Sequence, residues 1–482
     1  MIEDAIALAR VHAPLLAVAA PIAGAALCIV TLNARFGWII GVFASLISAA
    51  IATDLAARAL VFGAPLRTAA EGVALVPDRL GAFAAGVVSV AALLAAIGTG
   101  ARASASRDGA LTIVLVLLSA AGWLAAAYTT NALVLMLGTE IAWLAGVGVV
   151  ALGGEGKRTP LNAAARMLSV GAVGVAFSML GLALIADATG TLSLSMLAEN
   201  LSFDTQPFSM GFALVLGGLA LKAGVAPFHL WVGAAFTRAN AATLLTVGCV
   251  SAAGALLAIV RVVSYGVVAP EFGAAVFWAL APLGVACVVI GSVQAIGARD
   301  LRRLIAYALT AQMGGVMLCV SLGSPAGFAA GLIQITAIVG AGLALFGAAT
   351  VSESYKVNDI DGLARRAPFS SAAFTFGAAS LIGAPMTIGF LGRWRLVEAG
   401  VGVDWWWPVG AMTLASLAAV FYGGQLIERV YFRRAQEVQA RSGDRWRYAS
   451  FPALAAGVIV IALGLAPQAL LAAADAAAMV AP

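Results

Sequence analysis

The chain is dominated by apolar runs of about 17 to 25 residues, each long enough to cross a lipid bilayer as a helix. Because lipid offers no partner for backbone polar groups, runs of this length are typical of membrane-spanning helices. With 62% hydrophobic and 10% charged residues, the composition excludes an ordinary soluble protein, in which about 25% of residues are charged. We predict an all-α polytopic membrane protein, with residues 1–482 forming a single integral membrane domain. The fourteen predicted spans centre on Pro21, Ser45, Val90, Leu118, Trp143, Val175, Leu219, Ala252, Val285, Met313, Val339, Leu381, Leu417 and Val460.

The basic residues in the loops predict how the spans are oriented. Cytoplasmic loops of membrane proteins carry an excess of lysine and arginine. Here these residues follow the odd-numbered spans, whereas the alternate loops are nearly free of them apart from Arg58, Arg67 and Arg79 before the third span. We expect the odd loops to be cytoplasmic and both termini to lie on the outer face of a bacterial-type inner membrane. The odd-loop cations are Arg35, Arg102, Arg107, Lys157, Arg158, Arg238, Arg299, Arg302, Arg303, Lys356, Arg365, Arg366, Arg433, Arg434, Arg441, Arg445 and Arg447.

Several classes of site and partner find no support in the sequence. The formal net charge of +5 is spread over short loops, so it bears on topology and does not indicate a nucleic-acid partner. The four cysteines lie inside apolar runs without CxxC spacing, which supports no disulfide framework, metal site or iron–sulfur cluster. We therefore expect no cofactor and no metal. Glu3 and Asp4 open the chain in place of a basic region, which argues against a cleaved signal peptide.

A lysine and a helix break stand together in the seventh predicted span, FALVLGGLALKAGVAPFHLW. Lys222 lies near the middle of this apolar run, and Pro227 interrupts the backbone hydrogen bonds five residues later. Both features are costly in hydrocarbon and are tolerated where they face protein or a water-filled cavity. Arginine, the usual cation of this chain, stays protonated, whereas a buried lysine can release and retake a proton. We interpret Lys222 as the proton-holding group of an ion-translocating protein; the alternative is a lysine permanently paired with a carboxylate for structural reasons.

Two further ionisable residues are candidates for the same site. Glu140 lies in the apolar run LVLMLGTEIAWLAGVG, where a carboxylate pairs, takes up a proton or lines water. If its helix packs against the seventh span, Glu140 and Lys222 form a pair whose making and breaking changes the proton affinity of the lysine. The alternative is a neutral carboxyl group bonded to a hydroxyl such as that of Thr139. His229 follows the break and is either a proton relay or a packing residue.

The twelfth predicted span repeats the pattern of the seventh. Its sequence SLIGAPMTIGFLGRWR contains Pro385 inside an apolar run, with Arg393 close by. The two segments lie five spans apart and therefore cross the membrane in opposite directions. Paired broken helices in inverted halves form the ion site of many transporters. The alternative is coincidence, since proline is frequent in membrane helices. Arg393 can set a field or bind a carboxylate, but it cannot shuttle a proton.

Other polar residues in the spans have less specific roles. Gln334, Thr246 and Ser251 are candidate water-binding links, although such residues also serve helix packing. Arg166 and Arg261 stand near the ends of spans, where long basic side chains commonly extend to the membrane interface.

Three motifs in order resemble a known superfamily. LALKAGVAPFHLW, ARDLRRLIAYALTAQMGG and LIGAPMTIGFLGRWRLVEAG are similar to segments of the proton-conducting, antiporter-like subunits of respiratory complex I, Mrp-type antiporters and membrane-bound hydrogenases. The last motif most resembles the N-type subunit of complex I and the D-type subunit of Mrp antiporters, and the resemblance extends from about Leu115 to Phe432. It implies two inverted five-helix repeats, about 110–262 and 273–432, each with a broken helix. It also implies a glutamate on the fifth helix and a lysine on the seventh, which match Glu140 and Lys222.

The sequence departs from the pattern of this superfamily in three places. The eighth helix commonly carries a basic residue, but VSAA at 250–253 supplies none. The eleventh helix, QITAIVGAGLALF, lacks the basic residue or histidine often found there, and the lysine of the twelfth helix is replaced by Arg393. Two alternatives follow: a partly water-based proton path, or a path that keeps only the half containing Glu140 and Lys222.

We therefore expect a non-redox, proton-translocating subunit of a multisubunit energy-converting complex, with other membrane subunits as partners. Protons are the expected ion and sodium is the alternative. Lys222 would hold the proton, Glu140 would modulate it, His229 would relay it, and Arg393 would act electrostatically toward the exit. The other hypotheses are a stand-alone cation/proton transporter and a structural subunit that no longer conducts.

Overall fold

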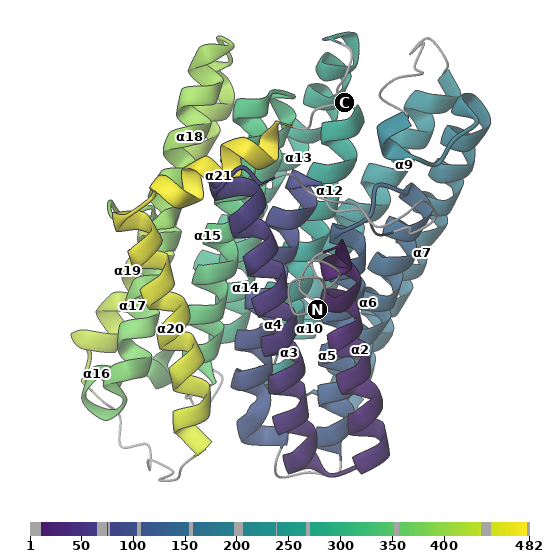
Figure 1. Ribbon diagram of the computed structural model, residues 1–482. Helices are drawn as coiled ribbons and strands as arrows, with labels where there is room; N and C mark the ends of the chain where they lie inside the picture. Colours follow the sequence, from purple (N-terminus) through teal and green to yellow (C-terminus); the bar gives the residue numbers. More distant parts are fainter. Residues whose placement is uncertain are drawn as a thin grey trace.

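The computed structural model describes residues 11–64, 75, 78–103, 108–153, 158–196, 206–237, 239–266, 270–350, 356–434 and 445–479. Within these ranges every named element is a helix, which confirms the predicted all-α fold. The long helices run side by side through the bundle (Figure 1). The α-helices are α2 (Ala13–Thr31), α3 (Ala34–Ala56), α4 (Arg79–Ala103), α5 (Asp108–Ala127), α6 (Ala132–Leu152), α7 (Arg158–Thr189), α9 (Gln206–Ala223), α10 (Val232–Phe236), α11 (Ala241–Leu245), α12 (Ala252–Gly266), α13 (Pro270–Gly297), α14 (Leu301–Ser321), α15 (Pro325–Ala349), α16 (Leu363–Arg366), α17 (Pro368–Ile382), α18 (Ile388–Gly402), α19 (Trp406–Tyr431), α20 (Arg445–Leu465) and α21 (Gln468–Ala478).

Short helices of other types interrupt or join these elements. Two are π-helices, η1 (Ala57–Val61) and η3 (Thr246–Ser251). The other two are 3-10 helices, η2 (His229–Trp231) and η4 (Val357–Ile360). A π-helical turn widens the backbone locally and often marks a functional site. The η3 segment continues into α12, so the eighth predicted span is wound irregularly in its first half.

Each predicted span centre lies on a helix, but the helices differ in how they could cross a membrane. Eleven helices of the described residues are long and apolar enough to span a bilayer, and α20 with α21 makes a twelfth if this pair, bent by 84°, counts as one span. The two remaining predicted spans, centred on Leu219 and Leu381, are interrupted helices: α9 is followed by η2 and α10, and α17 by α18. The exact number of fourteen therefore stays a prediction.

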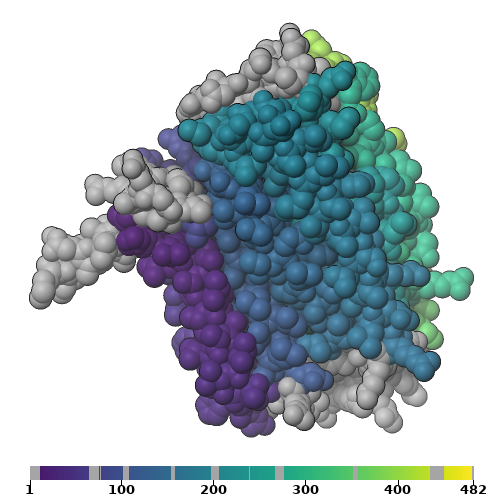
Figure 2. All heavy atoms as spheres, turned by 90° about the vertical axis from the view of Figure 1, so that its right-hand side faces the viewer, coloured from purple at the N-terminus to yellow at the C-terminus, as the bar shows by residue number. Residues whose placement is uncertain are grey.

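Three central helices form the core of the bundle. The apolar stretches of α14 and of the α11–η3–α12 segment are entirely buried, and that of α15 is 89% buried. By contrast, only 33% of the corresponding stretch is buried in α3, α7 and α19, which lie at the periphery. Figure 2 shows the flank formed by α7 and α9, where Leu168, Phe177 and Leu180 are exposed. Exposed leucine and phenylalanine on spanning helices are compatible with contact to lipid.

The described parts of the loops that follow the ninth and eleventh spans meet at one end of the bundle, the lower end in Figure 1, where α16 lies. Asp300 and Lys356 form an isolated β-bridge, which joins the loop before α14 to the loop after α15. Arg429 of α19 pairs with Asp361 at 3.0 Å in the same region. The contacts agree with the predicted grouping of these loops. Among the cations used for that prediction, Arg67, Arg107, Lys157, Arg238 and Arg441 lie outside the described residues.

Candidate functional site

The first broken helix ends directly before Gly224, which adopts a φ of +73°. This left-handed conformation favours glycine and terminates α9. The polar groups freed by the break find partners within the protein: Trp231 donates its indole N–H to the carbonyl of Leu221 at 3.1 Å, and the amide of Ala226 lies 2.9 Å from the sulfur of Cys287. The break is therefore stabilised by specific contacts, as non-helical backbone at membrane depth requires.

Lys222 occupies the last turn of α9, and its side chain is fully buried. Its ammonium group forms an ion pair with Glu140 of α6 and donates a hydrogen bond to the hydroxyl of Thr139 at 3.0 Å. The hydroxyl of Thr139 in turn donates to the carbonyl of Met136 at 2.9 Å. The carboxylate of Glu140 is bonded to Lys222, and no hydrogen bond between these described residues joins it to the Thr139 hydroxyl. The structure thus brings together Lys222 and Glu140, which the sequence indicated as a possible pair from separate spans. The carboxylate side is less enclosed, since 17% of the Glu140 side chain is exposed.

A small cavity of about 20 Å³ lies beside Lys222. A water molecule needs a cavity of roughly 10 to 15 Å³ by this measure, so the space is large enough for one water. Its walls join α9 to the π-helix η3 and to the centre of α14. Residues lining it include Lys222, Trp231, Val247, Gly248, Ala252, Ala306, Thr310 and Phe346. The eighth span, which has no basic residue in its VSAA segment, therefore contributes space next to the lysine.

His229 lies just beyond the break and is buried. Its Nε2 atom is 2.9 Å from the side-chain oxygen of Gln294 on α13, and its ring meets that of Tyr307 edge to face. Nδ1 is buried without a hydrogen-bond partner among the described residues. The imidazole thus has one nitrogen engaged and the other open. This arrangement is compatible both with a proton relay through water and with a packing role.

The second broken helix resembles the first in its geometry. Gly383 ends α17 with a φ of +78°, and Thr387 caps the start of α18 by accepting a hydrogen bond from the amide of Phe390 at 3.3 Å. The guanidinium group of Arg393 reaches back across this break and donates to the carbonyl oxygens of Leu381 and Ile382. These carbonyls belong to the last turn of α17, where no following helical residue satisfies them. Arg393 therefore closes the break.

Neutral side chains surround Arg393 on the other side. Its guanidinium donates to the amide oxygen of Gln312 on α14 at 3.0 Å, and Gln334 of α15 donates to the same oxygen at 3.2 Å. The amide nitrogen of Gln312 donates to the hydroxyl of Tyr422 on α19 at 3.2 Å. No described carboxylate forms an ion pair with Arg393. Gln334, a predicted water-binding link, thus belongs to this cluster.

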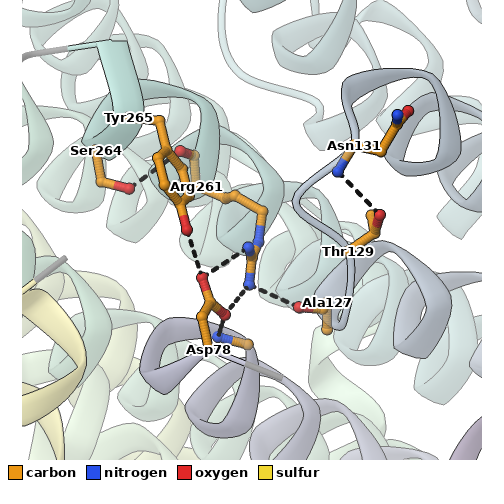
Figure 3. A network of polar contacts seen from close by, with 8 residues as sticks. Asp78, Ala127, Thr129, Asn131, Arg261, Ser264 and Tyr265 are labelled. Atoms are coloured by element: carbon orange, nitrogen blue, oxygen red, sulfur yellow. Dashed lines mark hydrogen bonds and ion pairs between the residues drawn. The ribbon is translucent and has the colours of Figure 1, made fainter. Parts of the chain in front are cut away.

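The prediction that Arg261 extends to the membrane interface is wrong. Arg261 is 1% exposed, and its guanidinium forms two hydrogen bonds with Asp78, at 2.7 and 2.9 Å. It also donates to the carbonyl of Ala127 at 2.7 Å, and the hydroxyl of Tyr265 donates to Asp78 at 2.8 Å (Figure 3). A forked arginine–carboxylate pair of this kind is specific in geometry. It ties the end of α12 to the start of α4 and the end of α5.

The remaining candidates divide between packing and open positions. The hydroxyl of Ser251 lies 3.4 Å from that of Ser119, whereas the hydroxyl of Thr246 is buried without a partner among the described residues. Arg166 is exposed on α7, as expected for a side chain at an interface. Within the same residues, no group of three or more histidine, cysteine, aspartate or glutamate side chains is suited to a metal.

Sequence reasoning missed four residues that the structure places in these clusters, namely Asp78, Gln294, Gln312 and Tyr422. Each contacts a residue far away in the sequence, so no local spacing predicts its role. Gln312 alone could have been noticed, because it stands inside the motif ARDLRRLIAYALTAQMGG that carries the family resemblance.

Known proteins share the sequence pattern and the fold of this chain. NADH-quinone oxidoreductase subunit N of Thiobacillus denitrificans is 30% identical over 371 residues, covering 74% of this chain and 75% of that protein. A chain of respiratory complex I from Thermus thermophilus is 25% identical with a TM-score of 0.77, covering 94% of this chain and 98% of that one. A chain of the Mrp complex from Dietzia sp. DQ12-45-1b reaches a TM-score of 0.82 at 22% identity, with 97% of each chain covered, which shows a shared fold.

The family described as NADH:quinone oxidoreductase/Mrp antiporter, TM, matches residues 129–418. This range contains Glu140 and Lys222, both broken helices, and Arg393 with Gln312 and Gln334, and it covers more than half of the sequence. The chain therefore belongs to the family of membrane subunits shared by NADH:quinone oxidoreductases and Mrp antiporters.

Proposed function

We propose that this chain is a proton-translocating membrane subunit of a multisubunit energy-converting complex. The observation that carries the proposal is the Lys222–Glu140 ion pair, held at a helix break beside a cavity of about 20 Å³. Charged groups are retained inside membrane proteins chiefly where they serve a pathway for ions or protons. Relatives with the same fold are named as subunits of complex I and of an Mrp complex, which supports membrane subunits as partners.

The Lys222–Glu140 pair suggests how the charge of Glu140 controls the proton held by Lys222. While Glu140 is ionised, it stabilises the ammonium form of Lys222 at a buried position. A proton arriving at Glu140, or a movement that separates the two groups, removes this stabilisation and favours release of the lysine proton. The cavity toward Thr310 gives that proton a place to leave through water. His229, with Nδ1 open, is the proposed relay on the far side of the break.

The second half is assigned an electrostatic role. Arg393 stays protonated and holds a fixed positive charge near the centre of α14, α15 and α18. A proton passing through this half would therefore travel by water and neutral side chains. The alternative in which the path keeps only the first half predicts the same behaviour of Lys222.

We also propose the internal organisation and the orientation. The two broken helices support inverted repeats at about 110–262 and 273–432, because their breaks match in the left-handed glycine. The gathering of basic loops at one end supports a cytoplasmic position for that end, with both termini on the outer face.

The test is proton pumping by the assembled complex reconstituted into liposomes. Lys222→Ala removes the proposed proton-holding group and should therefore lower the proton flux roughly tenfold or more. A tenfold loss corresponds to a barrier higher by about 1.4 kcal/mol. Lys356→Ala, at an exposed loop lysine, is the matched control and should pump normally. Assembly is checked by native gel. Full pumping by assembled Lys222→Ala would refute the proposal and favour the structural-subunit alternative. Proton flux by the purified chain alone would favour a stand-alone transporter.

A further inference from the structure

Two buried tryptophans face each other beside the Lys222–Glu140 pair. The rings of Trp143 on α6 and Trp231 on η2 meet edge to face, with their centroids 5.1 Å apart and their planes at 85°. Aromatic pairs favour this geometry, because the positive edge of one ring meets the negative face of the other. The contact joins α6 to the segment that follows the first helix break.

Each tryptophan is connected to one member of the ion pair. Trp143 follows Glu140 by three residues, so the two side chains lie on one face of α6. Trp231 donates its indole N–H to the carbonyl of Leu221, the residue before Lys222, and its ring lines the cavity beside the lysine. The same two segments are thus joined twice, once by opposite charges and once by two rings.

The hydrogen bond from Trp231 replaces one that the break removes. In a continuous helix the carbonyl of Leu221 would accept from the amide of Val225, four residues later. That amide donates instead to Ala220 at 3.0 Å, and the amide of Gly224 makes a longer bond of 3.3 Å to the Leu221 carbonyl. The indole N–H, at 3.1 Å, therefore completes the bonding of the turn that carries the lysine.

Helix α7 fixes Trp143 from a third side. A Cβ atom at Gly171 would lie 1.9 Å from the indole nitrogen of Trp143, so the close approach of the ring requires glycine at this position. The same nitrogen is buried and has no hydrogen-bond partner among the described residues. The shape of the site and the ring contact, rather than a hydrogen bond, therefore determine where Trp143 lies.

We propose that Trp143 and Trp231 are positioning residues for proton exchange at Lys222. When Glu140 takes up a proton or moves away, the attraction between the two charges is lost. Neither indole ring titrates, so the rings stay in contact and keep the two segments at the spacing from which the ion pair forms again. This inference rests on the proposed function and adds to it the contact that makes opening of the pair reversible.

Glu140 is the carboxylate that controls the charge of Lys222, because the other described groups nearby are neutral or directed elsewhere. The cavity beside Lys222 is lined by no second titratable side chain. On the elements packed against α6 and α9, the other charged or titratable side chains are exposed or contact other groups. The exposed ones are Asp108, Arg158, Arg166 and Asp187, whereas Arg261 and Tyr265 contact Asp78, His229 contacts Gln294, and the sulfur of Cys249 lies 3.9 Å from the carbonyl of Leu244.

The test measures proton flux by the assembled complex in liposomes as a function of pH. Trp231→Phe keeps an aromatic ring but loses the indole N–H, and Trp143→Leu removes the ring contact. In both variants Glu140 should hold the ammonium group less firmly. A pair weakened about threefold should lower the flux about threefold and move the alkaline side of the pH profile about half a unit toward lower pH, since one unit corresponds to tenfold in proton affinity.

The matched control for these variants is Trp123→Phe. Trp123 is also buried, and its indole N–H has no partner among the described residues. The control therefore removes a similar volume from the core without touching the ion pair, and it should leave the pH profile unchanged.

A second pair of variants displaces the ring without changing it. Gly171→Ala places a methyl group against Trp143 and should reproduce the shift of the pH profile. Gly217→Ala on α9 is its control, because the added Cβ atom would come no closer than 3.8 Å to Phe177. Native gels confirm assembly of each variant. If Trp143→Leu fails to assemble, Trp231→Phe and Gly171→Ala decide the question.

Two results would overturn this inference and leave the proposed function intact, as long as Lys222→Ala still stops pumping. One is an unchanged pH profile in assembled Trp231→Phe and Gly171→Ala. The other is an equal shift in Trp123→Phe, which would show that the loss of any buried indole has this effect. Normal pumping by Lys222→Ala would instead refute the proposed function itself.

Discussion

The two halves of the molecule each place a cation beside a broken helix, but they balance its charge in different ways. In the first half, Lys222 faces the carboxylate of Glu140 and a hydroxyl group. In the second half, Arg393 faces backbone carbonyls and the amide of Gln312. A lysine with one ionisable partner has two charge states within reach, whereas an arginine among neutral groups keeps one. The difference supports the proposal that the first half exchanges protons and that the second half holds a fixed positive charge.

The largest effect is expected from breaking the titratable pair. Glu140→Gln leaves the buried ammonium of Lys222 without a counter-ion, and removing one partner of a buried pair costs about 3 to 5 kcal/mol. We expect proton flux in liposomes to fall roughly tenfold or more, with a lower melting temperature of the purified complex.

A double variant separates stability from transport. Lys222→Met combined with Glu140→Met replaces the pair by apolar side chains, which often restores stability. The melting temperature should recover while the flux stays low. Recovery of the flux would show that the Lys222–Glu140 pair has only a structural role. The two halves would then not differ in proton exchange.

Arg393 tests the fixed-charge half. Arg393→Leu leaves the carbonyls of Leu381 and Ile382 without their donor, and each unsatisfied buried group costs about 1 to 3 kcal/mol. We expect a lower melting temperature and a flux reduced by severalfold. Arg393→Lys keeps the charge and should retain more flux than Arg393→Leu. If both variants pump at the normal rate, the charge in the second half has no part in transport.

A variant of the Asp78–Arg261 pair tests whether the loss of any buried ion pair lowers proton transport, or only the loss of the Lys222–Glu140 pair. Asp78→Asn keeps an oxygen acceptor but removes the charge, and a hydrogen bond to a charged group contributes about 1.5 to 3 kcal/mol. The melting temperature should fall, while the flux per assembled complex stays near normal. A loss of flux as large as that of Glu140→Gln would mean that the first-half pair is not special.

Tyr422→Phe should have the smallest effect. It removes the hydroxyl that accepts from Gln312 at 3.2 Å, one neutral hydrogen bond worth about 1 kcal/mol. We expect a slightly lower melting temperature and nearly unchanged flux. A strong loss of flux would indicate that this hydroxyl lies on the proton path and that the second half conducts through side chains.

The sequence predicted most of the fold because apolar runs fix the helices, and a lysine inside such a run needs a partner. It correctly paired Lys222 with Glu140. It misjudged Arg261, because the carboxylate of Asp78 lies 183 residues earlier and carries no local signal. It made no prediction for α21, which follows Pro467 and lies at 84° to α20. Contacts between distant spans depend on packing, which no local pattern records.

The central claim is that the first half needs a cation able to lose its proton. Lys222→Arg tests it most directly, because arginine keeps the charge and the reach toward Glu140 but does not deprotonate. The measurement is proton flux by the assembled complex in liposomes, normalised to the amount of complex. We predict a loss of roughly tenfold or more with assembly intact. Normal flux with Lys222→Arg would contradict the account, because a fixed charge would then suffice.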